Sequence, residues 1–368
     1  AKRAMDAPPS VAQRFDPAAL GVGAVFLNES GAGATALSFH RAGGLLISCG
    51  GDGSVRFVDA VAGASRKVVY CKKFGVGAAC FTHHETSILH AGCPGVATMK
   101  GPAVVPGAAP HGGHHGLLST ATPAGRAEAY AIRYLGLHDN KYLRTFRGHA
   151  GQVTSLAMNP ANDEFLSCGE DGIVAAWNLS SARSGATAVI DAREAGLVPV
   201  AVEYFRDGLV FAVGCAVAEH HGGTSSHDGD EQQRRSNGFS SGGSSSRSKP
   251  TSFGAIKLFD TRNYTAGPFM TVDLKKAHVA GAAGLPGSTG TDPSSLSLLT
   301  DRLGRAKLTG LEASPDGESL LVKTDCCAHL VYDSFDGRPL SVLWDDDATY
   351  STGRGARVVG SSLFSASS

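Results

Sequence analysis

Residues 148–178 contain a fixed order of small, polar and apolar residues that limits what this part of the chain can fold into. In order, they are Gly148 and His149, an apolar run at 153–158, a turn at Asn159 and Pro160, a second run ending in Ser167-Cys168-Gly169, the turn Asp171-Gly172, and a third run ending in Trp177-Asn178. Short apolar runs separated by turn residues predict neighbouring antiparallel strands of one small sheet.

About thirty residues separate the Gly-His pair from the tryptophan, which is the layout of a WD repeat, one four-stranded blade of a β-propeller. The inner strands of a blade are buried by the neighbouring blades, so their polar groups must find partners inside the blade. We therefore expect His149, Ser167, Asp171 and Trp177 to form one hydrogen-bonded chain across the sheet. These residues would be structural, so the pattern predicts a fold and no chemistry.

The same pattern recurs along the chain once three low-complexity segments are set aside. Residues 35–70 form a first unit in which Ser48 and Asp52 match Ser167 and Asp171, although Val58 replaces the tryptophan. Three further units start near residues 77, 197 and 308. The fold class predicted is therefore all-β, a propeller with five recognisable blades. A leftover apolar stretch at 23–27 is expected to supply an outer strand to the last blade.

The three set-aside segments, 92–126, 216–252 and 278–306, hold most of the excess glycine, of which the chain has 48. They lack the apolar periodicity that would offset the entropy lost on ordering, so we expect disordered loops. We assign residues 11–344 to one propeller domain that contains these insertions, and residues 345–368 to a disordered tail.

Charge and cysteine content exclude several classes of partner. Lys plus Arg and Asp plus Glu balance at 33 each, which gives no net field for nucleic acid or membrane binding. The eight cysteines contain no CxxC pair and are expected to be thiols, with Cys49, Cys168 and Cys215 buried at the ends of second strands. No apolar run is long enough to span a membrane.

Four stretches resemble one family more closely than they resemble a generic WD repeat. They are RKVVYCKKFGVG (66–77), IRYLGLHDNKYLRTFRGH (132–149), IKLFDTRNYTAGPF (256–269) and LTGLEASPDGESLLV (308–322). They resemble the WD-repeat subunit of COMPASS-type histone H3 lysine methyltransferase complexes. That subunit is shared with cleavage/polyadenylation (transcription-termination) complexes, and its plant members are called anthesis-promoting-factor-like.

The resemblance implies a nuclear, non-catalytic scaffold. Such a subunit would bind a segment of the methyltransferase catalytic subunit, contact other subunits of the complex, and couple it to RNA polymerase II with a phosphorylated C-terminal domain. Two alternatives stay open: a scaffold of a phosphatase-containing transcription-termination complex, and a substrate receptor of a ubiquitin ligase. The family ring has seven blades, whereas the repeat pattern here stops after five. We therefore expect an incomplete propeller, with an open ring favoured over a closed ring of five.

Candidate partner-binding residues are the charged residues at turns that a propeller places on one rim. Lys72, Lys73 and Arg147 lie between successive blades, and Asp52 and Glu170 lie at second-to-third strand turns. A mixed-charge rim suits a short peptide, although a merely solvated surface explains the same residues. Histidines at 83–84, 111–115 and 220–221 are interpreted as solvated residues. No metal, cofactor or catalytic residue is expected.

Overall fold

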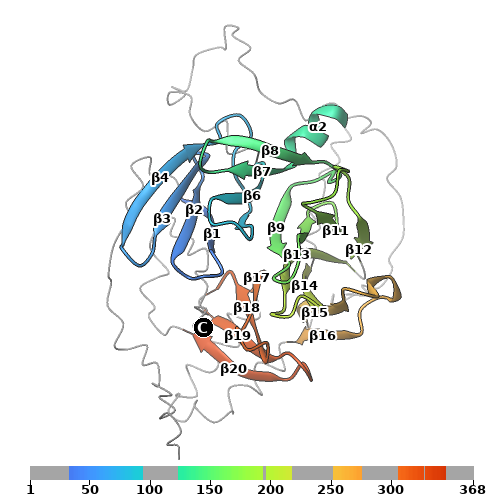
Figure 1. The fold of residues 1–368 in the computed structure, drawn as a ribbon. Coiled ribbons are helices and arrows are strands. Elements are labelled where there is room, and N and C mark those ends of the chain that lie inside the picture. Colours follow the sequence, from blue (N-terminus) through green and yellow to red (C-terminus); the bar gives the residue numbers. More distant parts are fainter. Residues whose placement is uncertain are drawn as a thin grey trace, which may run out of the picture.

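Five antiparallel sheets of four strands make up nearly all of the regular structure, arranged around a common centre as a β-propeller (Figure 1). The computed structural model describes residues 33–93, 123–193, 196–217, 252–275, 306–326 and 328–344. Within each sheet the four strands are neighbours in chain order, so every blade is a simple meander. The repeat pattern in the sequence predicted this arrangement, and the five blades confirm it.

The blades follow one another along the chain. Blade one contains β1 (Ala34–Phe39), β2 (Leu45–Gly50), β3 (Ser54–Asp59) and β4 (Ala64–Tyr70). Blade two contains β5 (Ala79–Phe81), β6 (Ser87–Ala91), β7 (Ile132–Gly136) and β8 (Lys141–Phe146). Blade three contains β9 (Val153–Met158), β10 (Glu164–Gly169), β11 (Ile173–Asn178) and β12 (Ala188–Asp191). Blade four contains β13 (Leu197–Tyr204), β14 (Val210–Val217), β15 (Ser252–Asp260) and β16 (Met270–Lys275). Blade five contains β17 (Leu308–Ala313), β18 (Ser319–Thr324), β19 (Ala328–Asp333) and β20 (Pro339–Trp344).

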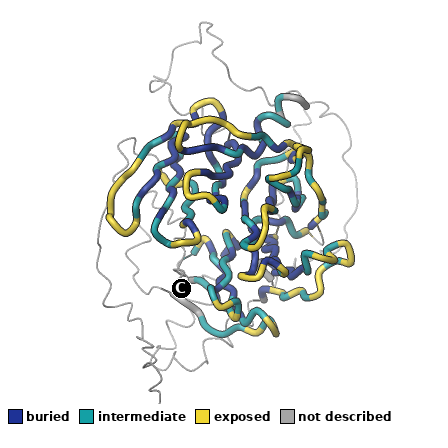
Figure 2. The backbone as a smooth tube through the Cα atoms, viewed as in Figure 1, coloured by how far each residue is buried: buried dark blue, intermediate teal, exposed yellow. Residues whose placement is uncertain are grey.

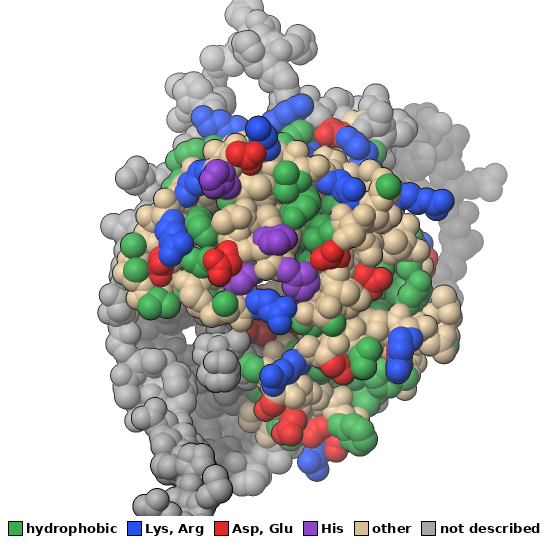
Figure 3. Space-filling view, in the orientation of Figure 1, with side chains coloured by type: hydrophobic (Ala, Val, Ile, Leu, Met, Phe, Trp, Pro, Cys, Tyr) green, Lys and Arg blue, Asp and Glu red, His purple; other side chains and the backbone are tan. Residues whose placement is uncertain are grey.

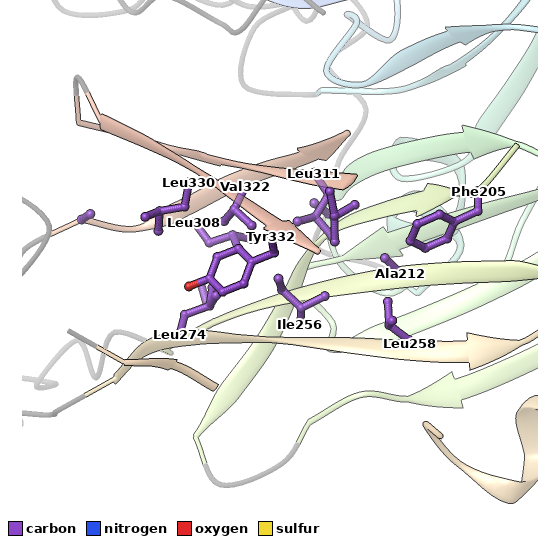
Figure 4. Close-up of a cluster of buried hydrophobic side chains, with 14 residues drawn as sticks. Phe205, Ala212, Ile256, Leu258, Leu274, Leu308, Leu311, Val322, Leu330 and Tyr332 are labelled. Atoms are coloured by element: carbon purple, nitrogen blue, oxygen red, sulfur yellow. The ribbon is translucent and has the colours of Figure 1, made fainter. Parts of the chain in front are cut away.

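The hydrophobic core lies between the blades rather than inside any one of them. Alternate side chains of a strand point to opposite faces of the sheet, so each blade contributes one apolar layer to each neighbour. Four clusters of buried side chains fill the junctions from blade one to blade five. Figure 4 shows the junction of blades four and five, where Leu258 and Ile256 face Leu311 and Tyr332. Buried residues follow the inner strands of the blades, whereas the turns and much of the outer strands β4, β8 and β12 are exposed or half-buried (Figure 2).

The outward face of blade one is less buried than the matching face of an interior blade. Leu46 and Ser48 of β2 are only half-buried, whereas Phe165 and Ser167 of β10 are completely buried. Among the described residues, no core cluster joins blade five to blade one. The stretch at 23–27 that was expected to close the ring lies outside the described residues, so the open ring stays a prediction.

Strand register shows why blade one tolerates the loss of the tryptophan. Val58 lies opposite Leu46 in blade one, just as Trp177 lies opposite Phe165 in blade three. Trp177 packs in the cluster that joins blades two and three, whereas Val58, although only 3% exposed, belongs to none of the clusters between described blades. A small β-branched residue therefore suffices at position 58.

Third strands end on an aspartate that fixes the following turn in three blades. Asp59 accepts hydrogen bonds from the Ala62 amide at 2.8 Å and from the Arg66 guanidinium at 2.5 Å. Asp260 in blade four accepts from Arg262, and Asp333 in blade five accepts from the amides of the next turn. Hydrogen bonds to the charged form lower the pKa of all three carboxyls, to about 2 for Asp260.

The prediction of disordered loops is wrong at the ends of two low-complexity segments, where the structure has a helix or a strand. A short helix, α2 (Pro123–Ala129), begins inside the segment predicted as a disordered loop at 92–126. β14 extends to Val217 and β15 begins at Ser252, so both enter the segment predicted at 216–252. Strand pairing across blade four explains the second difference, because each strand has a partner to extend along. Residues 94–122, 218–251, 278–305 and 345–368 lie outside the described residues.

Candidate functional site

His149, Ser167, Asp171 and Trp177 meet in one hydrogen-bonded chain inside blade three. The Asp171 carboxylate lies 2.9 Å from His149 Nδ1 and accepts the Ala150 amide at 2.8 Å. His149 Nε2 lies 2.7 Å from Ser167 Oγ, which also accepts the Trp177 indole N–H at 2.8 Å. The chain connects the turn before β9 with β10 and β11, so it ties three strands of the blade together.

Chemical roles fix the direction of this chain. An ionised carboxylate can only accept, so His149 must donate from Nδ1, which leaves Nε2 to accept the Ser167 hydroxyl proton. The hydroxyl oxygen is then free to accept the indole N–H, and every polar group has a partner. Burial raises the pKa of Asp171, but the hydrogen bonds from His149 and Ala150 outweigh it and hold the pKa below its usual value.

Glycine is required beside the tryptophan because the indole ring lies against the backbone there. A Cβ at Gly148 would lie 3.0 Å from Trp177 Cη2, closer than side-chain atoms tolerate without a shift of the ring. The Gly-His pair of the motif therefore combines two needs, space for the indole and a ring nitrogen for Asp171.

Blade one keeps the Asp-Gly turn of this motif. Asp52 accepts the Ser54 amide at 3.0 Å and the Ser54 hydroxyl at 2.5 Å. Ser48 lies in β2 opposite Arg56 and is half-buried. The structure therefore places Asp52 at the expected turn but does not join it to Ser48.

The predicted partner-binding residues lie at turns on one rim of the propeller. Lys72 and Lys73 belong to the turn from β4 to β5, which Gly75 closes with a φ of 67°. Arg147 belongs to the turn from β8 to β9, and Asp52 and Glu170 belong to the turns β2–β3 and β10–β11. Arg147 is ion-paired with Glu128, whereas Asp52 accepts from Ser54 within its own turn, so the five residues lie in separate turns of one rim.

An aromatic ring at the centre of the β4–β5 turn holds cations around it. The Lys73 ammonium lies 4.9 Å from the centre of the Phe74 ring, and the Arg133 guanidinium lies 3.3 Å from it. Lys72 lies over Tyr70 at 5.6 Å, and the Phe74 ring meets Tyr142 edge-on at 6.1 Å. Such contacts between cations and ring faces are attractive and orient the side chains.

Glu128 of α2 forms ion pairs with two arginines of this rim, Arg147 and Arg133. Its carboxylate accepts from Arg147 Nη2 at 2.8 Å and Nε at 3.0 Å, and from Arg133 Nη2 at 3.3 Å. Arg133 also donates to the Ala131 carbonyl at 3.0 Å and to the Glu128 carbonyl at 2.5 Å. Burial raises the pKa of Glu128, but the two arginines lower it by more, so the carboxylate is ionised at neutral pH.

Arg133 of blade two corresponds to a small residue, Ala175, in blade three. Arg133 lies opposite His90 in the second strand of its blade, and Ala175 lies opposite Ser167 in the second strand of blade three. His90 is completely buried, and burial lowers its pKa to about 3, so it is neutral beside the arginine. Blade two thus replaces the histidine-serine-tryptophan chain with a buried arginine that reaches the rim.

Turns on the opposite rim connect blades one, two and three. Arg41 Nη1 donates to the Pro160 carbonyl at 3.2 Å and lies 3.5 Å from His83 Nδ1. His83 Nε2 donates to the Asn162 carbonyl at 2.8 Å. Figure 3 shows acidic and basic side chains interspersed on one face, with histidines near its middle. His83 is therefore a contact between blades rather than the solvated residue that was predicted, whereas His84 is exposed. Positions 111–115 and 220–221 lie outside the described residues.

Possible metal ligands in the described part of the chain lie apart from one another. No group of three or more His, Cys, Asp or Glu side chains there could hold a metal ion. The seven described cysteines are free thiols, and Cys49, Cys168 and Cys215 are buried in second strands as predicted. None of the described helices has the length and apolar character needed to cross a bilayer.

Sequence reasoning missed the residues that organise this rim: Tyr70, Phe74, Glu128, Arg133 and Tyr142. A buried arginine in a strand gives no signal beyond a charge in an apolar run, IRYLG. Glu128 follows a low-complexity segment directly, and nothing in its composition predicts a helix there. The opposite charges of Glu128 and Arg133, five residues apart, were the one feature of the sequence that could have suggested an ion pair. That interpretation requires knowing that a short turn separates the two residues.

Comparison with known proteins agrees with this geometry. The model of the WD domain, G-beta repeat, matches residues 25–59 and 140–178, which include most of blade one and of blade three. The chain is a five-bladed β-propeller in which two segments match the WD40 repeat. Both matched segments contain the Ser–Asp spacing from which the repeat was predicted.

Proteins of plants, flies and yeast are similar to this propeller. It is 29% identical to Anthesis promoting factor 1 of Arabidopsis thaliana, over 68% of this chain and 54% of the relative. It is 26% identical to WD repeat-containing protein 82 of Drosophila melanogaster, over 84% and 65%, and 24% identical to COMPASS component SWD2 of Saccharomyces cerevisiae, over 84% and 64%. The propeller thus spans between about half and two thirds of the length of these relatives.

The names of these relatives match the family that the sequence resembles. That family was suspected from four stretches, and those at 66–77 and 132–149 matched most closely. Those stretches contain Phe74, Arg133 and Arg147, so the residues that carried the resemblance also build the rim.

Proposed function

We propose that this propeller is a non-catalytic scaffold subunit of a nuclear histone H3 lysine methyltransferase complex of the COMPASS type. The observation that supports it most is similarity to proteins named COMPASS component SWD2 and Set1 complex component swd2, combined with the five-bladed fold. A propeller displays many turns on two rims and so suits the binding of several partners at once. Its fold alone does not fix a function, so the relatives carry the proposal.

In this proposal the rim with Lys72, Lys73 and Arg147 holds a short segment of the catalytic subunit. Exposed cations beside exposed aromatic rings offer both electrostatic attraction and apolar contact to a peptide. The complex would be coupled to transcribing RNA polymerase II through its phosphorylated C-terminal domain. Catalysis is assigned to the partner, because the relatives that support the proposal are named as components of a complex.

Affinity purification from nuclear extract followed by mass spectrometry tests the proposal. We expect methyltransferase catalytic and accessory subunits among the proteins recovered with the tagged chain. Recovery of phosphatase and cleavage factors without a methyltransferase would favour the termination scaffold. Recovery of a cullin-type ligase alone would favour the substrate receptor, and either result would contradict the proposal.

A further inference from the structure

Cations outnumber carboxylates on the rim formed by the turn β4–β5, the turn β8–β9 and α2, here called the basic rim. Lys72 and Lys73 are exposed, and 51% of the Arg147 side chain is exposed. Arg133 lies beneath them with 1% of its side chain exposed. In the described part of the chain, Glu128 is the carboxylate that contacts these cations, and neither lysine has an ion pair.

The Glu128 carboxylate, which pairs with Arg147 and Arg133 on the basic rim, does not come from a strand of a blade. Glu128 belongs to α2, which lies in the connection between β6 and β7 rather than in a sheet. The end of α2 is well packed, since Ala129 is 1% exposed and Arg133 donates to the Glu128 carbonyl. The Glu128 side chain itself is 29% exposed and lies at the edge of the rim. α2 thus presents a carboxylate to two arginines that the blades supply.

Exposed ion pairs of this kind are easily exchanged. Both Arg147 contacts go to one oxygen of Glu128, at 2.8 and 3.0 Å, so the guanidinium keeps donors for another acceptor. Water competes for partly exposed pairs, which contribute little to stability. A second carboxylate can therefore replace Glu128 without unfolding the blade, because Arg133 keeps its two carbonyl partners.

Apolar surface adjoins the charged part of the basic rim. Tyr70 is 52% exposed beneath the Lys72 ammonium, and Tyr142 is 43% exposed against Phe74. Exposed aromatic rings next to cations are typical of peptide-binding surfaces, where they supply apolar contact beside the charge. A ligand that fits both features has carboxylates next to an aliphatic or aromatic residue.

We propose that the basic rim binds an acidic peptide segment of a partner protein, whose carboxylate displaces Glu128 from Arg147 and Arg133. Glu128 acts as an internal competitor that keeps the site neutralised when the partner is absent. The bound segment would thus be acidic, which deepens the proposed function. It rests on that function only because it requires a partner protein. A carboxylate is chosen over a phosphate because a carboxylate occupies the site in this structure.

Fluorescence anisotropy with the full chain tests the inference. The probes are a labelled peptide rich in Asp, Glu and Leu, the same peptide with phosphoserine in place of its Asp and Glu, and a Lys-rich peptide of the same length. We expect the acidic peptide to bind more tightly than the Lys-rich peptide, with affinity falling as salt is added. Binding of the phosphoserine peptide alone would overturn the inference.

Substitutions separate competition by Glu128 from a general charge effect. Glu128→Gln is expected to strengthen binding up to about five-fold, the size expected for removing an exposed ion pair. Arg147→Glu and Lys73→Glu are each expected to weaken it about ten-fold. The matched control is Arg262→Glu, an exposed ion-paired arginine on the opposite rim, which should leave binding unchanged. Circular dichroism melts establish that each variant is folded.

The inference fails if Glu128→Gln leaves affinity unchanged or weakens it, or if Arg147→Glu behaves like Arg262→Glu. Its failure differs from failure of the proposed function. A chain that recovers methyltransferase subunits but does not bind the acidic peptide contradicts the inference alone. A chain that binds the peptide but recovers no methyltransferase contradicts the proposed function alone.

Discussion

At the scale of single residues, hydrogen-bond partners decide which polar positions of the repeat matter. Ser167 and Ser48 occupy the same place in β10 and β2, each four residues before the aspartate of the next turn, Asp171 or Asp52. The Ser167 hydroxyl joins a histidine and an indole, whereas the half-buried Ser48 hydroxyl makes no side-chain hydrogen bond to the other described residues. A serine at this position therefore contributes more to the free energy of unfolding in blade three than in blade one.

Replacing Ser167 by Ala should destabilise the protein by about 1–3 kcal/mol, because it leaves the Trp177 donor and the His149 acceptor buried without partners. The matched control is Ser48→Ala, which should change stability by no more than about 0.5 kcal/mol. Urea denaturation followed by tryptophan fluorescence measures both. Equal losses in the two variants would contradict the role given to the blade-three chain.

Asp171 should make the stability of blade three depend on acid. The folded state lowers the pKa of its carboxyl, so its contribution is present above the unfolded-state pKa of about 3.9 and is lost as pH falls through the lower folded value. We expect Asp171→Asn to lower the urea midpoint at pH 7, and the difference from the native chain to shrink below about pH 4. A difference that stays constant from pH 7 to pH 3 would contradict this assignment.

At the scale of elements, one buried arginine connects a strand, a helix and a turn. Arg133 of β7 donates to carbonyls on both sides of the turn that follows α2, and its guanidinium stacks on Phe74 of the turn β4–β5. The helix therefore depends on the strand for its position. This explains why α2 forms at the end of a glycine-rich stretch whose own propensity does not favour a helix.

Replacing Arg133 by Met should cost about 1–3 kcal/mol, since the Ala131 and Glu128 carbonyls lose their donor while Arg147 still neutralises the Glu128 carboxylate. Thermal melts measure the loss. Arg262→Met on the opposite rim, where 71% of the side chain is exposed, serves as the control and should leave the melting temperature nearly unchanged. A melt of the Arg133 variant that matches the control would mean that α2 is held by other contacts.

Turns and strands were predictable from the sequence to the extent that local chemistry fixes them. The Asp-Gly turn before β11, the burial of Cys168 and the aspartate at the end of β3 all follow from residue types at short spacing. The contacts of Glu128 could not be predicted, because they depend on where the connection β6–β7 meets β7 and the turn β8–β9 on the rim. Spacing along the chain does not record how separate turns come together.

At the scale of the whole molecule, blades differ in how many neighbours cover them. Blade three contributes to one core cluster with blade two and to another with blade four. Blade one contributes to a cluster with blade two only, among the described residues, and every position of β1 is half-buried or exposed. Blades in the middle of such an arrangement should therefore open less often than blade one.

Hydrogen exchange followed by mass spectrometry can measure this difference. We expect amides of β10 and β11 to exchange more slowly than the equivalent amides of β2 and β3, because blade three is packed on both faces. Blade two serves as an internal reference, since it is also covered on both sides. Equal protection of blade one and blade three would show that the outward face of blade one is sealed, as in a closed ring.

The central claim is that this propeller holds a segment of a methyltransferase complex on its basic rim, and cross-linking mass spectrometry of the purified complex tests it most directly. Cross-links formed by a lysine-reactive reagent identify both the bound protein and the rim that it contacts. Lys72 and Lys73 lie on the basic rim, whereas Lys141, which is 75% exposed, lies on the opposite rim. The account predicts cross-links from the methyltransferase catalytic subunit to Lys72 or Lys73 and few to Lys141. Cross-links concentrated at Lys141, or none to a methyltransferase subunit, would contradict it.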